Sequence, residues 1–98
     1  MNLLDQAQYG DRRHTRILSS SAEAKLVLFS LANGQEVKGR GEPRVHMIAL
    51  EGRGSLWAGE NRIDAKAGTM IQAEPGEAHG AAAADGNFLV LGIITPGS

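Results

Sequence analysis

The sequence contains no cysteine, and this absence removes several kinds of protein from consideration. A chain without thiols has no disulfide framework, no thiolate zinc site and no cysteine nucleophile. An excess of charge of one sign is missing too, because ten basic and eleven acidic side chains leave a net charge of −1. No global field is available to attract phosphate backbones or anionic lipid, so we expect neither nucleic acid nor a membrane surface as a partner.

Long apolar runs are also missing from the sequence. None approaches the roughly 20 residues needed to cross a bilayer, and the first residues, Met1–Asp5, lack a basic stretch leading into an apolar core. We therefore expect a cytoplasmic protein. A chain of 98 residues with 42% hydrophobic and 21% charged residues is of ordinary globular composition. Because so short a chain has too little interior for two cores, we predict one domain over residues 1–98.

What the sequence does contain is a series of short apolar stretches rich in β-formers and separated by turn residues. They are Arg16–Leu18, Lys25–Leu31, Val45–Leu50, Ser55–Ala58, Arg62–Ala65, Thr69–Ala73 and Phe88–Ile94. None is long enough for a typical helix. The run Ala81–Ala84 favours a helix by propensity, but it is short and lies between two turn signals. The pattern predicts eight or nine short strands in an antiparallel sandwich or barrel.

Glycine and proline mark the expected turns. Three glycines among charged residues predict a long loop over Asn33–Pro43. Gly52-Arg53-Gly54 is typical of a hairpin turn, and Asp85-Gly86 predicts another turn before the last strand. The start of the chain, up to Gly10, allows one or two helical turns. We therefore expect an N-terminal arm over residues 1–15 and a barrel over residues 16–96.

Four segments occur in the order and spacing of a known family. They are Gly34–Val37, Leu50–Gly54, Ala67–Ile71 and Pro75–His79. The chain resembles a small single-domain cupin of the cupin 2 conserved-barrel type, and the resemblance extends from about Lys25 to Pro96. It implies an all-β fold, a cupin-type jelly-roll β-barrel (double-stranded β-helix), in a protein that is commonly dimeric.

The resemblance also implies a metal site, because three histidines and a glutamate of the family motifs converge on one divalent ion. The first motif is G-x5-H-x-H-x3,4-E-x6-G, in which alternate strand residues point the same way. Counting back from Gly52 puts Val45, Gly41 and Gly39 at the ligand positions, none of which offers a donor side chain. A strand register is fixed by pairing, so this count is safer than one across a glycine-rich loop.

A count from the N-terminal glycine of the first motif assigns different residues to the ligand positions. Counting forward from Gly34 places Arg40, Glu42 and His46 at the ligand positions. The second motif, G-x5-P-x-G-x2-H-x3-N, matches at Gly76 and His79, while Glu74 and Ala83 replace the proline and the asparagine. The metal motif is therefore degenerate, and His79 alone is carried over from the family pattern. The expected cofactor is none or one divalent transition metal ion.

The remaining candidates line the expected barrel interior. Leu28, Met47, Ala49, Met70 and Phe88 would form an apolar cavity, which suits a small hydrophobic or amphipathic ligand. Trp57, the single tryptophan, could stack on a ligand there or contribute to packing. Together with His79, the predicted ligand-binding residues are Met47, Trp57, Met70 and Phe88.

Three functions remain open at this point. One is a small-molecule-binding, ligand-sensing barrel without the usual metal. Another is a metal-dependent enzyme of the oxygenase or isomerase type, with His79, His46 and Glu42 as ligands. A third is a structural dimerisation module. In each case we expect a homodimer, because Leu26–Leu31 and Phe88–Ile94 are apolar on both faces and one small barrel has only one interior.

Overall fold

A computed structural model describes residues 1–96 and shows a nearly all-β chain. A 3₁₀ helix, η1 (Leu3–Gln6), precedes seven strands in these residues. The strands are β1 (His14–Ser20), β2 (Lys25–Leu31), β3 (Glu36–Gly39), β4 (Arg44–Ala58), β5 (Asn61–Lys66), β6 (Met70–Ala73) and β7 (His79–Thr95). The predicted fold class is confirmed. Within the described residues, no helix is long and apolar enough to cross a membrane.

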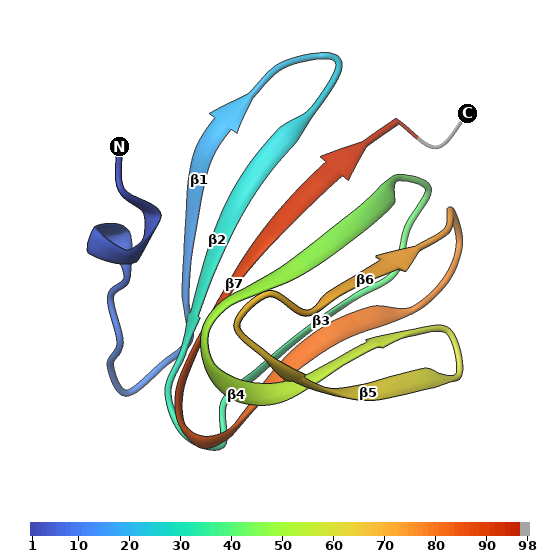
Figure 1. The fold of residues 1–98 in the computed structure, drawn as a ribbon. Coiled ribbons are helices and arrows are strands. Elements are labelled where there is room, and N and C mark those ends of the chain that lie inside the picture. Colours follow the sequence, from blue (N-terminus) through green and yellow to red (C-terminus); the bar gives the residue numbers. More distant parts are fainter. Residues whose placement is uncertain (97–98) are drawn as a thin grey trace.

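Two long, bent strands, β4 and β7, organise the barrel (Figure 1). They pair with each other along their length, and every other strand pairs with one half of one of them or with a neighbour. The C-terminal half of β7 and the N-terminal half of β4 join β2, β1 and β6. The other two halves join β3 and β5. All pairs are antiparallel, so the chain forms two sheet halves that share two strands and face each other.

The prediction of a hairpin at Gly52-Arg53-Gly54 is wrong, because β4 bends at this point and continues. The chain does not reverse there, because residues on both sides of Gly52 pair with β7. The register shifts at this point, and Gly52 adopts a φ of 87°. A Cβ on Gly52 would lie 1.9 Å from the carbonyl oxygen of Asn87. Glycine is therefore needed for the close approach of two bent strands, which a sequence pattern does not distinguish from a turn.

Two other segments that the sequence predicts to be loops or turns belong to strands in the structure. The predicted loop over Asn33–Pro43 contains the short strand β3, which pairs with β7. The predicted turn at Asp85-Gly86 falls inside β7, where residues 84–87 bulge out of the ladder between the pairs Gly52–Phe88 and Gly54–Ala83. The strand interpretation of Ala81–Ala84 is confirmed.

The core lies between the two sheet halves and follows the alternation of the strands. In β4, Val45, Met47 and Ala49 are buried while the residues between them are half-buried. Burial of the inward residues continues through Leu56 to the end of β4. Such alternation is expected of strands that cover one interior.

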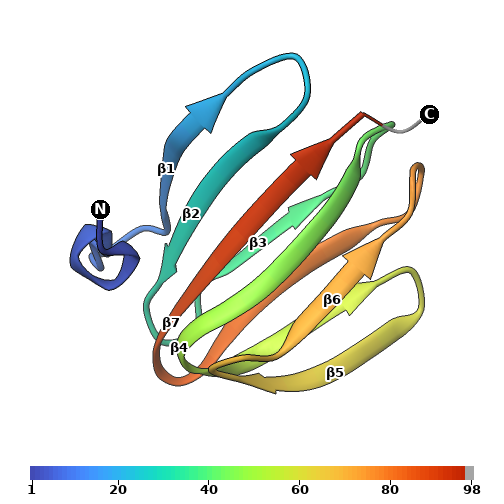
Figure 2. The same cartoon turned by 45° about the horizontal axis from the view of Figure 1, so that its top comes forward.

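The N-terminal arm lies on the outside of the β1–β2 side of the barrel, as Figure 2 also shows. The backbone N–H of Gln8 donates a hydrogen bond of 3.1 Å to Oγ of Ser30, which is fully buried. The expectation that Leu28 faces the barrel interior is wrong. It lies on the same side of β2 as Ser30, whereas Phe29 and Leu31, which alternate with it, face the core. The arm is slightly shorter than expected, since β1 begins at His14.

Candidate functional site

A mostly apolar cavity of about 190 Å³ opens between the two sheet halves. Four strands contribute to it: β2, β3, β4 and β7. Its hydrophobic walls are formed by Phe29, Val37, Val45, Met47 and Ile94, and His79, Gly80 and Lys38 complete the lining. The two ends of β7 meet here, because His79 begins the strand and Ile94 lies near its end. The cavity is thus a consequence of the bend that brings both ends of β7 to one place.

The imidazole of His79 is the candidate polar contact in this cavity. Its Nδ1 lies 3.4 Å from the carbonyl oxygen of Glu77. A carbonyl oxygen only accepts, so this long contact favours a proton on Nδ1 and leaves Nε2 as an acceptor. Within residues 1–96, no hydrogen-bond partner reaches Nε2. An acceptor is therefore free beside apolar walls.

The space next to Nε2 exists because residue 39 is a glycine. Gly39 pairs directly with His79 in the β3–β7 ladder. A Cβ on Gly39 would lie 2.8 Å from Nε2 of His79 and 3.2 Å from Cε1. Any larger residue at this position would displace the imidazole.

The metal that the fold family implies does not fit these residues. Gly39 and Gly41 have no donor side chain, and Val45 presents an alkyl group to the cavity with 5% of its surface exposed. One imidazole does not hold a transition metal ion against water. Over residues 1–96, no three or more His, Cys, Asp or Glu side chains gather closely enough to hold a metal ion.

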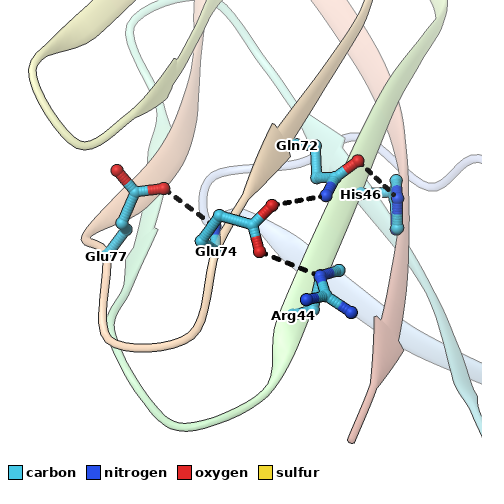
Figure 3. A network of polar contacts seen from close by, with 5 residues as sticks. All are labelled: Arg44, His46, Gln72, Glu74 and Glu77. Atoms are coloured by element: carbon cyan, nitrogen blue, oxygen red, sulfur yellow. Dashed lines mark hydrogen bonds and ion pairs between the residues drawn. The ribbon is translucent and has the colours of Figure 1, made fainter. Parts of the chain in front are cut away.

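The other predicted metal ligands lie elsewhere. His46 sits between the buried Val45 and Met47, so its side chain points out of the opposite face of β4. There its Nε2 lies 3.0 Å from Oε1 of Gln72 (Figure 3). Glu42 is exposed in the segment between β3 and β4. The structure therefore does not bring His79, His46 and Glu42 together.

His46 belongs to a polar network on the outer surface of β4 and β6 (Figure 3). Gln72 donates to Oε1 of Glu74 at 2.7 Å, and Nε of Arg44 lies 3.0 Å from Oε2 of the same carboxylate. The backbone N–H of Glu74 donates to Oε1 of Glu77 at 2.8 Å. The hydrogen bond from Arg44 is the main reason that the pKa of Glu74 is lowered. This network is exposed and remote from the cavity walls.

The predicted ligand-binding residues divide into two groups. Met47 and His79 both line the cavity. Phe88 is fully buried in the core but does not line the cavity. The expectation that Met70 faces the interior is wrong, because 54% of its surface is exposed.

Trp57 also lies away from the cavity lining. It is half-buried between the buried Leu56 and Ala58, so its ring lies on the outer side of β4. The guanidinium of Arg62 stacks on it, 4.5 Å from the ring centre. The ring rests on Gly80, where a Cβ would lie 2.2 Å from Cζ2. Trp57 is therefore a packing residue, one of the two roles considered for it.

Sequence reasoning missed five of the cavity residues: Phe29, Val37, Lys38, Gly80 and Ile94. A signal is present in the alternation Glu36-Val37-Lys38, which is typical of a strand although the glycines around it favour a loop. Phe29 and Ile94 lie in predicted strands whose inward face the sequence does not identify, because both faces are apolar.

A larger hollow of about 440 Å³ lies on the surface near the bulge of β7, and its polar walls include Arg53, Asp64, Lys66 and Asp85. Its two basic and two acidic side chains give no net charge to select a ligand. The smaller apolar cavity is the better candidate site, because enclosed apolar walls with few polar groups are typical of small-molecule sites.

Comparison with known proteins supports the fold. No family model and no curated protein matches the sequence. Among solved structures, TT1209 from Thermus thermophilus matches with a TM-score of 0.91 and 23% identity, over 98% of this chain and 95% of that one. An RmlC-like cupin from Desulfovibrio desulfuricans matches with a TM-score of 0.81 and 29% identity, over 98% and 94%.

A third structure agrees with these two. A Klebsiella pneumoniae protein with a double-stranded β-helix domain matches with a TM-score of 0.86 and 17% identity, over all of this chain and 90% of that one. The resemblance seen in the sequence is thereby confirmed at the level of the fold. The similarity assigns no activity to the site.

Proposed function

Because the chain folds as a small cupin domain, we propose that its barrel binds a small, largely apolar molecule without a metal ion. The observation that supports this proposal is the cavity of about 190 Å³ with apolar walls and one imidazole. No second His, Cys, Asp or Glu lines it among the described residues. The metal-dependent alternative therefore has no supporting observation here, and an interior with this much free space is poorly matched to a purely structural role.

The size of the cavity indicates the size of the ligand. An apolar cavity of about 150 Å³ in a protein core stays dry and accepts one benzene molecule. A cavity of about 190 Å³ therefore suits a single ring or a short branched chain with one further small group. Such a ligand would contact Phe29, Val45 and Met47 and fill the free volume that their side chains line. Dispersion and the hydrophobic effect would supply most of the affinity.

The polar group of the ligand is indicated by His79. With the proton on Nδ1, Nε2 accepts a hydrogen bond, so a hydroxyl group is the matching donor. Gly39 lies beside this nitrogen and has no side chain that would displace the imidazole. We therefore propose a monocyclic or short-chain alcohol or phenol as the ligand class, with phenol as the simplest probe.

What the cavity contains favours ligand sensing over catalysis. The lining offers one candidate acid–base group, His79, beside hydrophobic side chains and Lys38, whose Nζ is 3.2 Å from a carboxylate oxygen of Glu36. Binding shifts the folding equilibrium, by about 2.7 kcal/mol at a ligand concentration one hundred times the Kd. Occupancy would therefore be expressed as a change in the stability of the barrel.

Binding of phenol and of benzene to the untagged protein, followed by calorimetry and by thermal unfolding, tests this function. We expect both to raise the Tm and phenol to bind about three- to tenfold more tightly, since one hydrogen bond contributes about 0.5–1.5 kcal/mol. His79→Leu should remove the preference for phenol. His46→Leu is the matched control, because that imidazole lies on the outer surface, and it should keep the preference.

Two results would overturn the proposal. One is that neither probe binds at millimolar concentration. The other is that the preference for phenol persists in His79→Leu, which would place the hydroxyl group away from this imidazole.

A further inference from the structure

The ladder between β4 and β7 is interrupted where both strands bend, and a surface hollow lies beside the interruption (Figure 1). Arg53 is the one β4 residue between two successive pairs of this ladder, whereas β7 inserts residues 84–87 between the same two pairs. A bulge bends its strand and redirects side chains, and bulges are frequent beside functional sites. The side chains that this bulge brings together are therefore candidates for a function.

The hollow beside the bulge has a volume of about 440 Å³ and gathers charged side chains from three strands. Lys66 of β5 lies directly opposite Arg53 in the β4–β5 ladder. Asp64 is on the same face of β5 as Lys66, because the buried Ala65 separates them. Asp85 comes from the bulge itself. Two cations and two anions thus surround one space.

These four charges have no ionic partner inside the protein. The two ion pairs that form within residues 1–96 involve other side chains. Like charges that face each other directly across two strands destabilise a sheet. The position of Arg53 opposite Lys66 is therefore unfavourable in the empty protein, and an anionic group bound between them would relieve the repulsion.

The backbone around the hollow is held in place by hydrogen bonds. The N–H of Lys66 donates to Oγ1 of Thr69 at 3.1 Å, and the N–H of Thr69 donates to the carbonyl oxygen of Lys66 at 2.9 Å. At the bulge, the N–H of Gly86 donates to Oδ1 of Asn33 at 3.3 Å. The hydroxyl of Thr69 accepts in this arrangement, so its own proton can be donated to a ligand. A frame that is already formed lowers the entropic cost of binding.

We propose that this hollow is a second binding site, for a small zwitterion of the amino-acid class. The carboxylate lies between Arg53 and Lys66, within reach of the Thr69 hydroxyl, and the ammonium group lies toward Asp64 and Asp85. Equal numbers of cations and anions favour neither a simple anion nor a simple cation, but they match a molecule that carries both charges.

The spacing along β5 indicates how far apart the two charges of the ligand are. Asp64 and Lys66 are two residues apart on the strand, which corresponds to about 6.8 Å. A carboxylate and an ammonium group separated by several ångströms fit this spacing, as in 4-aminobutanoate. All four charged side chains are exposed, and exposed charge pairs are weak and screened by salt. We therefore expect a dissociation constant in the millimolar range that rises with ionic strength.

NMR titration of the untagged, ¹⁵N-labelled full chain with 4-aminobutanoate, acetate and methylammonium at one low ionic strength tests the proposal. We expect 4-aminobutanoate to shift the amide signals of residues 64–69 and 84–87 in a saturable way. Acetate and methylammonium each carry one of the two charges. Each should bind at least tenfold more weakly, because linking two groups makes the second contact intramolecular.

Single substitutions that remove one charge of the hollow at nearly constant size give the second test. Lys66→Met and Asp85→Asn should each weaken 4-aminobutanoate binding at least fivefold. Lys25→Met is the matched control, since Lys25 lies in β2 outside the hollow, and it should bind like the parent. Lys66→Met should also have a Tm equal to or above that of the parent, because it removes the repulsion from Arg53. A residue with a purely structural role would lower the Tm when replaced.

Three results would overturn the proposal. One is the absence of any saturable shift at millimolar 4-aminobutanoate, and another is acetate binding as tightly, which would indicate a simple anion site. The third is unchanged binding in both Lys66→Met and Asp85→Asn. The residues that line this hollow and the apolar cavity are different ones, so the inference does not depend on the proposed ligand. His79→Leu should leave 4-aminobutanoate binding unchanged and Lys66→Met should leave phenol binding unchanged, which separates failure of one site from failure of the other.

Discussion

Gly39 and His79 face each other across the β3–β7 ladder, and the missing side chain of one makes room for the ring of the other. The position that a Cβ of residue 39 would take lies 2.8 Å from Nε2 of His79. In metal-binding cupins the motif places a histidine at position 39. Here a glycine at the same position leaves the imidazole of His79 undisplaced at the apolar cavity, and this arrangement is the basis of the proposed site.

Gly39→Ala should therefore weaken binding without unfolding the protein. The added methyl group meets only the tip of the imidazole, so the ring can turn aside at little cost, and we expect the unfolding free energy to change by less than about 1 kcal/mol. The affinity for phenol should fall at least threefold, because Nε2 moves and the space beside it is filled. Isothermal calorimetry measures the affinity.

Gly10→Ala is the control for this prediction, because nothing lies within 4 Å of a Cβ at that position in the arm. It should leave the phenol affinity unchanged. An undiminished affinity in Gly39→Ala would mean that the hydroxyl group does not occupy this space.

The cavity position of His79 could be predicted from the sequence because the second motif around it is local. Pro75-Gly76 and His79 lie within five residues, so no insertion can shift their spacing. The first motif spans the glycine-rich segment, and there the two counts disagree. The structure agrees with the count back from Gly52, since Gly39 pairs with His79 and Val45 lines the cavity.

The strands themselves were predictable from their β-rich composition, whereas their faces were not. Periodicity separates inward from outward residues only where one face is polar. In β2 and the end of β7 both faces are apolar, so Leu28 and Phe29 could not be told apart by pattern. The side chain of Met70 was wrongly predicted to face the interior for the same reason. It lies beside Ile48 on the outward side of a sheet that carries hydrophobic residues on both sides.

The packing of Trp57 on Gly80 gives a second prediction. A Cβ on Gly80 would lie 2.2 Å from Cζ2 of Trp57 and 2.5 Å from the backbone oxygen of Val37. The backbone cannot yield easily, so we expect Gly80→Ala to destabilise the protein by about 2 kcal/mol or more. Urea unfolding measures this loss.

The fluorescence of the protein reports on the same contact, because Trp57 is its only tryptophan. Displacement of the indole from Gly80 should shift the emission of the folded Gly80→Ala variant to longer wavelength as the ring becomes wetter. Arg62→Ala, which removes the stacked guanidinium but leaves Gly80 unchanged, serves for comparison. A Gly80→Ala variant as stable as the parent would show that the indole does not rest on this glycine.

The single tyrosine of the chain predicts an alkaline limit to stability. The pKa of Tyr9 is raised, mainly by burial and also by the charge of Glu51. Above pH 10, the unfolded chain releases this proton before the folded chain does. Stability is therefore unaffected by Tyr9 below pH 10 and falls as the pH rises from 10 toward and through the folded pKa.

Absorbance at 295 nm titrates Tyr9 directly in the folded protein and should give a pKa above 10. In Tyr9→Phe the part of the alkaline loss that comes from this residue disappears. Its hydroxyl group is buried and finds no hydrogen-bond partner among residues 1–96. The phenylalanine variant should therefore be as stable at pH 7, or more stable by up to about 1 kcal/mol. A titration at or below pH 10 would contradict the buried position of the ring.

The family metal site should be recoverable by restoring donors at the three positions that lack them. Gly39→His, Gly41→His and Val45→Glu would place two imidazoles and one carboxylate at the positions that the family motif assigns, and the His79 ring would have to turn to join them. The charge of a glutamate at position 45 is costly in an apolar wall unless it is paired. We therefore expect the triple variant to be less stable than the parent without metal and to gain stability on adding Ni²⁺ or Zn²⁺.

Equilibrium dialysis followed by metal analysis should give about one ion per chain for the triple variant at micromolar free metal, and well below one for the parent. The same three substitutions combined with His79→Ala should bind at least tenfold more weakly, because one of four converging donors is lost. If the triple variant is folded by circular dichroism and binds no more tightly than the parent, positions 39, 41 and 45 do not converge on His79. In that case the correspondence between this barrel and the metal-binding members of its fold would have to be redrawn.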